Sequence, residues 1–278
     1  MPTFDTPEPI DVTLEVGFGT VQITAGERAD SHVQVLPDDP TSHKDVKAAE
    51  RTLIEYGYGH LRIIDPTTDS RSWLRRSGSI KVTVELPSGS HLDARIAASD
   101  LRCDGHLGRA KIHSSHGLVH LDSADAIDIA AESGDIVVNH VHADAHAQST
   151  YRGIRIGVVD GEAVLSSASG AITLGTVAGA LRAESDSGDI AVEHALADVN
   201  ARSKHGSIRL GEVVRGSVTV ETGSGSLDLG VGPDTTAELD VDARHGTVQD
   251  LRTPAGRTAE TVGIRATTLH GSIVLRRS

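Results

Sequence analysis

Ala163–Leu210 reads AVLSSASGAITLGTVAGALRAESDSGDIAVEHALADVNARSKHGSIRL and contains one short phrase three times, as SGAITL, SGDIAV and HGSIRL. The glycines of these phrases, Gly170, Gly188 and Gly206, are evenly spaced along the chain. A fixed period, here about 18 residues, is the signature of a repeat protein, in which each unit stacks on the next. We call the residue in the glycine position the index residue of its repeat.

The phrase continues towards both ends of the chain. The spacings between successive index residues are 17, 18, 18, 18, 18, 19, 21 and 25, so the last copies carry insertions. One repeat length before the first index residue lies Ser99, which Leu101 and Cys103 follow in register. We therefore expect a repeat region over 96–278 and a separate region over 1–95. The index residues are Gly117, Gly134, Arg152, Gly170, Gly188, Gly206, Gly225, Gly246 and Gly271.

Each repeat alternates apolar and polar residues in two short runs. Apolar residues lie two and four positions after the index residue, as in Ile190 and Val192, and seven and five positions before it, as in Leu181 and Ala183. A period of two is typical of a β-strand with one buried face. Because a glycine marks each turn, we expect it to adopt positive φ. The pattern predicts an all-β fold, a β-solenoid of stacked two-stranded coils of about 18 residues.

Small hydroxyl-bearing residues recur three positions before the index residue. By the alternation of the strand they point inward. We interpret them as a stacked hydroxyl ladder at one corner of the coil, with a structural role. The residues are Ser114, Ser149, Ser167, Ser185, Ser203, Thr222 and Thr268.

Residues 1–95 lack the repeat but still favour strands. One amphipathic helix is expected at 43–56, with Val46, Ala49, Leu53 and Ile54 on its apolar face. A solenoid has to protect its terminal strand edges, so this β-rich region is predicted to be a cap. No linker rich in Pro or Ser separates it from the repeats, which favours one continuous body. The expected strands are IDVTLEV, GTVQITA, SHVQVLP, HLRIIDP and SIKVTVELP.

Three stretches of the chain resemble a known family. The opening FDTPEPIDVTLEVGFGTVQITAGE, the segment SIKVTVELPSGSHLDARIAASD and the repeated SGDI and HGSI phrases are similar to the bacterial "putative adhesin" β-strand-repeat proteins, called toastrack proteins. The likeness covers nearly the whole chain. It implies a bacterial β-solenoid, and it implies no catalytic residue because the family has no agreed activity.

Composition narrows the classes of partner. The net charge of −13 argues against nucleic acid or an anionic membrane as a partner, since both bind basic surfaces. No apolar run approaches the length of about 18 residues that spans a bilayer, so no membrane insertion is expected. The opening MPTFDTPEPI lacks the basic and apolar segments of a secretion signal, so we expect a cytoplasmic protein. The single cysteine, Cys103, falls on an inward position and is expected in the core.

The function that we favour is a non-catalytic structural or protein-interaction scaffold without a cofactor. Flat outward strand faces of mixed charge suit a protein partner or self-association better than a small molecule. The candidate residues of the first face are Arg155, Thr173, Asp189 and Arg209. Those of the second face are Arg182, Glu184, Arg202 and Glu221.

An alternative is an enzyme that acts on a carbohydrate or an envelope polymer. Glycoside hydrolysis needs two carboxyl groups about 5 to 9.5 Å apart. Asp135 and Asp189 occupy matched positions three coils apart, which corresponds to about 14 Å. Asp240 and Asp242 share one outward strand face, but no substrate groove is evident beside them.

A second alternative is a metal-binding module built from turn histidines. His245 and His270 each precede an index glycine in consecutive repeats, which predicts a separation of about 5 Å. Imidazoles at that spacing can bind zinc or copper. A second candidate set flanks an earlier turn, and a third group falls on one turn. These are His113, His116 and His120, and His140, His142 and His146, respectively.

Overall fold

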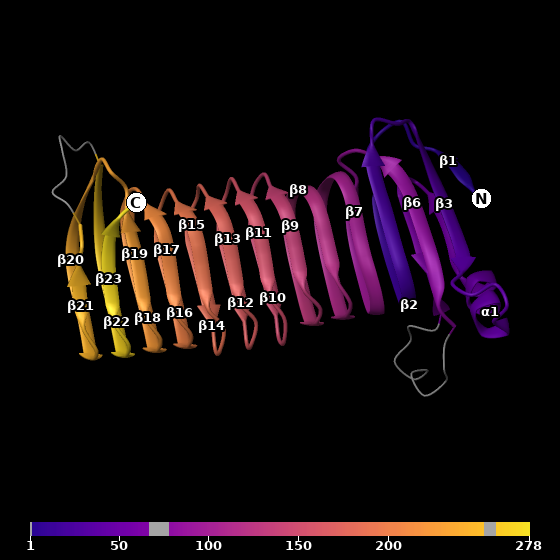
Figure 1. Cartoon of the computed structure of the whole chain (residues 1–278). Coiled ribbons are helices and arrows are strands. Elements are labelled where there is room, and N and C mark those ends of the chain that lie inside the picture. Colours follow the sequence, from indigo (N-terminus) through magenta and orange to yellow (C-terminus); the bar gives the residue numbers. More distant parts are fainter. Residues whose placement is uncertain (1, 67–77, 253–259) are drawn as a thin grey trace. The chain divides into compact units, whose positions relative to one another are not determined.

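β-Strands make up most of the chain in the computed structural model, which describes residues 2–66, 78–252 and 260–278 (Figure 1). The chain divides into two compact units, Met1–Asn139 and His140–Ser278. We call them unit 1 and unit 2 and describe each by itself. In the described ranges, no helix has the length and apolar character needed to cross a membrane.

Unit 2 contains the regular coils that the repeat predicts. Each coil contributes one strand to each of two ladders, and all the neighbours within a ladder are parallel. Ile172, Ile190 and Ile208 are register partners in succession, so one step along the stack is one repeat of the sequence. The first ladder contains β10 (Ala145–Ser149), β12 (Ala163–Ser167), β14 (Leu181–Ser185), β16 (Val199–His205) and β18 (Gly216–Ser224). The second contains β11 (Ile154–Val159), β13 (Ile172–Val177), β15 (Ile190–Ala195), β17 (Ile208–Val213) and β19 (Leu227–Val231).

The core of unit 2 lies between the two ladders. Every apolar residue predicted to point inward from Ala145 to Leu229 is buried, with a relative exposure of 3% or less. Burying an Ile, Leu or Val side chain stabilises a fold by about 1.5–3 kcal/mol. Since one coil cannot cover its own apolar face, this burial comes from stacking. The β-solenoid prediction is confirmed.

The hydroxyl ladder forms one corner of the coil, as the sequence predicts. All seven of its members are buried. The hydroxyls of Ser167 and Ser185 accept hydrogen bonds from the index N–H groups of their own coils, at 2.9 and 2.8 Å. Those of Thr222 and Thr268 donate to the index carbonyl of the neighbouring coil, at 2.8 and 3.0 Å. The ladder therefore satisfies backbone groups that the tight corner would otherwise leave unpaired.

The expected positive φ at the index glycines is wrong for most of them. Gly117 and Gly271 have φ of 114° and 144°, but Gly170, Gly188 and Gly206 do not adopt this conformation. Glycine is required at these positions because a Cβ would overlap the backbone of the coil before. A Cβ added to Gly188 would lie 2.1 Å from the carbonyl oxygen of Gly170 in the coil before it. Glycine is thus needed because successive corners stack backbone against backbone.

The last two coils of unit 2 do not follow chain order. They consist of β20 (Thr235–His245) with β21 (Val248–Asp250), and β22 (Glu260–His270) with β23 (Ile273–Arg277). β22 pairs with β18 on one side and β20 on the other, and β23 likewise lies between β19 and β21 (Figure 1). The final coil of the chain, β22 with β23, therefore lies between the coil of β18 and β19 and the coil of β20 and β21. Leu239 and Val241 of β20 are consequently only half-buried.

Unit 1 also places its first long strand inside the stack. β2 (Asp11–Gly26) pairs in parallel with β7 on one side and with β5 and β6 on the other. β7 then pairs with β8. The expected boundary at residues 95 and 96 falls within β7, which is continuous there. The bounds are β5 (His60–Ile64), β6 (Ile80–Pro87), β7 (His91–His116), β8 (Val119–Ser133) and β9 (Ile136–Val141).

Antiparallel strands and the helix lie beyond β6. β3 (Asp30–Pro37) pairs antiparallel with β6 and with β1 (Thr3–Asp5), and α1 (His43–Arg51) contacts β3. A pair of antiparallel strands does not continue a parallel coil, so this arrangement is consistent with the proposed cap.

The helix is shorter than the sequence predicts. Ser42 caps its N-terminus, and its hydroxyl accepts a hydrogen bond from the N–H of Asp45. The helix ends at Arg51, because the next residues form β4 (Leu53–Gly57), which pairs antiparallel with β5. Tyr58 and Gly59 both have positive φ, as a two-residue hairpin turn requires. The hairpin therefore takes Leu53 and Ile54 out of the expected helix.

Candidate functional site

The second predicted face is a row of ion-paired side chains on the outside of the first ladder. Glu184, Arg202 and Glu221 are register partners on β14, β16 and β18. Nε of Arg202 lies 3.3 Å from Oε2 of Glu221. Arg182 pairs with Glu184 at 2.7 Å on the same strand. The charges of this face thus alternate in sign from coil to coil.

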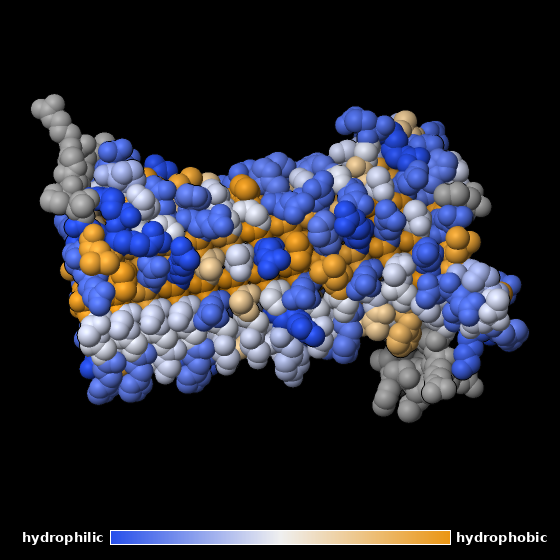
Figure 2. Space-filling view, viewed as in Figure 1, coloured by the Kyte–Doolittle hydropathy of each residue, from blue (hydrophilic) through white to orange (hydrophobic). Residues whose placement is uncertain are grey.

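A groove of about 610 Å³ crosses this face. Three carboxylates and two cations line it, together with hydroxyl groups and the exposed side chain of Leu269. Figure 2 shows, on one face of the molecule, rows of polar side chains with apolar side chains visible between them. The charged residues of the groove are Glu184, Asp186, Glu221, Arg202 and Lys204.

The first predicted face lies on the second ladder. Arg155 is the register partner of Thr173, and Arg209 follows two strands further on. Thr173 and Arg209 line a second groove, of about 550 Å³. Glu193, Glu212 and Arg276 add charges of both signs there.

Asp189, also predicted for the first face, has a structural contact. Its Oδ1 accepts a hydrogen bond of 2.7 Å from the N–H of Ser207 in the next coil. The N–H groups of Leu118 and Glu162 donate the same kind of hydrogen bond to Oδ1 of Asp100 and Asp144, at 2.8 and 3.0 Å. Asp189 therefore links two coils, and its side chain is exposed.

The predicted pair His245 and His270 lies as close as the repeat implies. The two residues are register partners on β20 and β22, and their rings stack with centroids 4.9 Å apart and an interplanar angle of 13°. Neither belongs to a set of three metal-ligating side chains among the described residues. The pair alone thus offers two nitrogen donors.

His113, His116 and His120 are not brought together in a group of three ligands within the described part of the chain. His113 and His116 lie on β7 opposite Ala130 and Ser133. His120 lies on β8 opposite Arg102.

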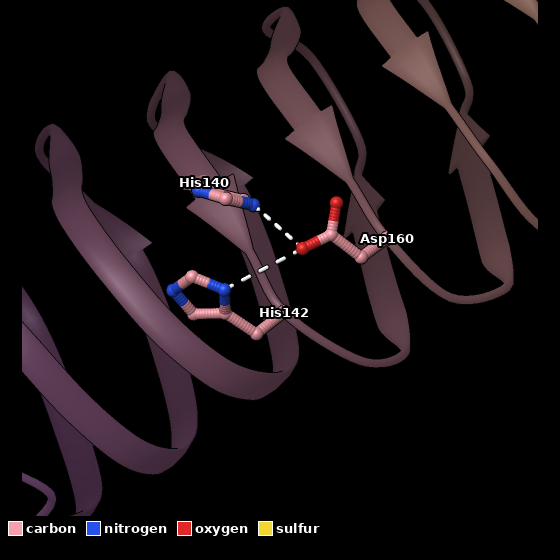
Figure 3. Close-up of side chains that lie close together, drawn as sticks. All are labelled: His140, His142 and Asp160. Carbon is pink, nitrogen blue, oxygen red and sulfur yellow. Dashed lines mark hydrogen bonds and ion pairs between the residues drawn. The ribbon is translucent and has the colours of Figure 1, made fainter.

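Two histidines of the third group, together with an aspartate, form the one set of three or more His, Cys, Asp or Glu ligand atoms found among the described residues. Its members are His140, His142 and Asp160, whose ligand atoms all lie within 4.8 Å of one another (Figure 3). Nε2 of His140 is 2.8 Å and Nδ1 of His142 is 3.5 Å from the same Oδ2 of Asp160. The hydrogen bond from His140, with the contribution of His142, lowers the pKa of the Asp160 carboxyl.

The sequence places the two histidines of this cluster on one turn without singling them out as metal ligands, and it does not point to the carboxylate. The available signal was the period, because Asp160 lies one repeat after His142 and occupies the same position in the next coil. His146, grouped with these histidines from the sequence, lies on β10 opposite Val164 and is not in the cluster.

The residues weighed for catalysis are engaged in other contacts. Asp240 pairs with Arg265 at 2.9 Å, and Asp242 lies 3.9 Å from Arg244. Cys103 is buried, and the loss of solvation raises the pKa of its thiol. A buried thiol with a raised pKa is a poor nucleophile at neutral pH.

Comparison with known proteins finds a matching family. The family described as "Toastrack DUF4097" matches residues 10–250. No curated protein matches. Three solved structures resemble the fold, with TM-scores below 0.5, so their names are not carried over to this chain.

The first is a "putative cell adhesion protein" of Clostridium sporogenes, with a TM-score of 0.26, 10% identity, and coverage of 100% of this chain and 98% of that one. The second is a "putative adhesin" of Parabacteroides distasonis, with a TM-score of 0.34, 12% identity, and coverage of 98% and 95%. The third is a "putative adhesin" of Bacteroides fragilis, with a TM-score of 0.32, 10% identity, and coverage of 99% and 95%.

Proposed function

The chain belongs to the Toastrack DUF4097 family, and we propose that it is a non-catalytic scaffold that binds a partner protein on the outer face of β14, β16 and β18. The observation that carries this proposal is the groove of about 610 Å³ on that face, which is lined by charges of both signs. The groove is built on strands of a packed stack, so its side chains are held at fixed spacing.

The charges of the groove favour a polypeptide partner. The whole chain has a net charge of −13, yet acidic and basic groups alternate here and pair with one another. A nucleic acid would need an excess of basic groups. Exposed ion pairs contribute only about 0–1 kcal/mol each, so a partner with complementary charges can replace them at little cost.

Leu269 supplies an apolar contact in the same groove. Its side chain is 43% exposed although it lies on β22, between two paired strands. Interfaces commonly combine a small apolar anchor with a polar rim. The groove offers both, with Leu269 beside Thr267 and the ion-paired row.

The proposal is tested by affinity capture with the immobilised full chain. The variant Glu184→Lys/Arg202→Glu/Glu221→Lys changes the charges of the groove, and Arg155→Glu/Arg209→Glu changes charges on the other ladder for comparison. The captured protein is then purified and its Kd for each chain is measured. We expect the first variant to lose at least about tenfold in affinity and the second to bind as the native chain does. Equal affinity for all three chains would overturn the proposal.

A second candidate function, self-association, rests on the terminal coil of unit 2. In the described residues, β20 pairs with β22 alone, and its other edge has no strand partner. Leu239 and Val241 are half-buried there and Val248 is 44% exposed. An open strand edge with apolar neighbours is a site for edge-to-edge pairing, and a second copy could pair through the same edge in a symmetric dimer.

Light scattering at increasing protein concentration tests this candidate. The expected result is a dimer that Leu239→Lys/Val241→Lys converts to a monomer with unchanged circular dichroism. A native chain that stays monomeric at millimolar concentration would contradict it.

A further inference from the structure

We propose that His140, His142 and Asp160 bind one divalent transition-metal ion of the zinc type, which links two successive coils of unit 2. This inference is independent of the proposed interaction function. It rests on the arrangement of the three side chains in Figure 3.

The repeat brings the three ligands together. His140 is on β9 and His142 follows two residues later, on either side of the buried Val141. Asp160 follows β11 directly, one repeat after His142. The backbone N–H of Asp160 donates to the carbonyl of Val141 at 2.9 Å, which holds the two turns in register. The ligands are therefore placed by the stacked backbone and not only by flexible side chains.

The distances suit a small tetrahedral ion. With bonds of about 2.0–2.1 Å, donor atoms around tetrahedral zinc lie about 3.3–3.4 Å apart. The observed distances to Oδ2 of Asp160, 2.8 Å from His140 and 3.5 Å from His142, bracket that value. Small side-chain rotations would place an ion between the three groups.

The chemistry of the ligands selects the class of ion. Two imidazoles and one carboxylate suit zinc and related transition metals, whereas calcium and magnesium prefer oxygen ligands throughout. The side chains are 36%, 43% and 48% exposed, so an ion can enter and water can complete its coordination.

Two other pairs of neighbouring side chains in unit 2, each with at least one histidine, provide controls. His194 and Glu212 are register partners with a contact of 3.2 Å, and His245 and His270 have stacked rings. Each pair supplies two donors, and neither belongs to a set of three within the described residues. If two neighbouring donors were enough, these pairs would bind zinc as well as the cluster does.

The experiment is calorimetric titration of the full chain with zinc chloride after treatment with EDTA. We expect one high-affinity site, whose affinity falls more than about 100-fold in His142→Ala and in Asp160→Asn. The variants His194→Ala and His245→Ala/His270→Ala should retain it. Cobalt(II) bound to the native chain should show the visible absorption of a four-coordinate ion.

Thermal unfolding provides a second readout that does not depend on heats of binding. Because the ion would join two coils, zinc at 100 times its Kd should raise the Tm by roughly 5 to 10 °C in the native chain and not in Asp160→Asn. Zinc binding that survives both cluster substitutions, or no binding to the native chain at all, would overturn the proposal.

Discussion

His142 and Asp160 occupy the same position in two successive coils, and Nδ1 of the histidine lies 3.5 Å from Oδ2 of the aspartate. The period of the repeat therefore turns a separation along the sequence into a contact in space. The same relation joins His194 to Glu212 and Asp189 to Ser207. In this fold, the outward contacts of a residue follow from its position in the repeat.

The index glycines give the first prediction. In Gly188→Ala, the new Cβ would lie 2.1 Å from the carbonyl oxygen of Gly170, and two stacked backbones would have to separate. We expect a loss of about 2–4 kcal/mol in the free energy of unfolding, measured by urea denaturation. Gly263→Ala is the control, because no other atom lies within 4 Å of its added Cβ. Its stability should stay within about 1 kcal/mol of the native chain.

The hydroxyl ladder gives the second prediction. Ser185→Ala removes the acceptor of a 2.8 Å hydrogen bond from the N–H of Gly188 and leaves that group buried and unpaired. The expected loss is about 1–3 kcal/mol. Ser166→Ala, on an outward position of β12, should change the stability by less than about 0.5 kcal/mol. Equal effects of the two substitutions in urea denaturation would show that the ladder does not stabilise the corner.

The order of the terminal coils gives the third prediction. Thr219 of β18 is the register partner of Arg265 of β22, whereas Asp240 of β20 lies one strand further away. A Thr219→Cys/Arg265→Cys pair should therefore oxidise readily to a disulfide. A Thr219→Cys/Asp240→Cys pair should not, because two strand spacings, about 9.6 Å, exceed disulfide reach. Stacking in chain order would give the opposite result when the bonds are mapped by mass spectrometry.

The pH dependence of the terminal coil gives the fourth prediction. Both oxygens of Asp250 accept hydrogen bonds from Arg252, at 2.8 and 2.7 Å, and this contact lowers the pKa of the carboxyl. A lowered pKa in the folded state stabilises the fold above the unfolded pKa of about 3.9, and the contribution is lost as the pH falls through the folded value. Asp250→Asn should therefore lower the Tm at pH 7 by at most about 3 °C, since the Asp250 side chain is 45% exposed and water screens the pair. The difference should narrow between pH 5 and pH 3, and a difference that widens would contradict this assignment.

Much of the coil could be predicted from the sequence because the same pattern of residues recurs in each repeat. The inward positions and the hydroxyl ladder recur in most copies, so each copy supports the others. The reason for glycine at the index position could not be read from the sequence in the same way, since positive φ and close backbone approach select the same residue. Only the distance between successive corners separates the two causes.

The less regular parts were harder to predict. Leu53 and Ile54 continue the apolar face of the helix, and only their pairing with β5 assigns them to a strand. The position of β22 between β18 and β20 could not be predicted from the repeat, because the pattern of inward residues is the same for either order of the last two coils. A cytoplasmic location and the interaction faces stay predictions.

The most direct test of the proposed interaction function is the affinity of the captured and purified partner for a charge-swapped chain. Arg202→Glu/Glu221→Arg exchanges the two members of the ion pair, so net charge is unchanged and an ion pair can still form between β16 and β18. We predict a stability within about 1 kcal/mol of the native chain, because these charges are exposed, and a Kd for the partner raised at least about tenfold, measured by isothermal titration calorimetry. A swapped chain that binds its partner as tightly as the native chain would show that this groove is not the binding surface.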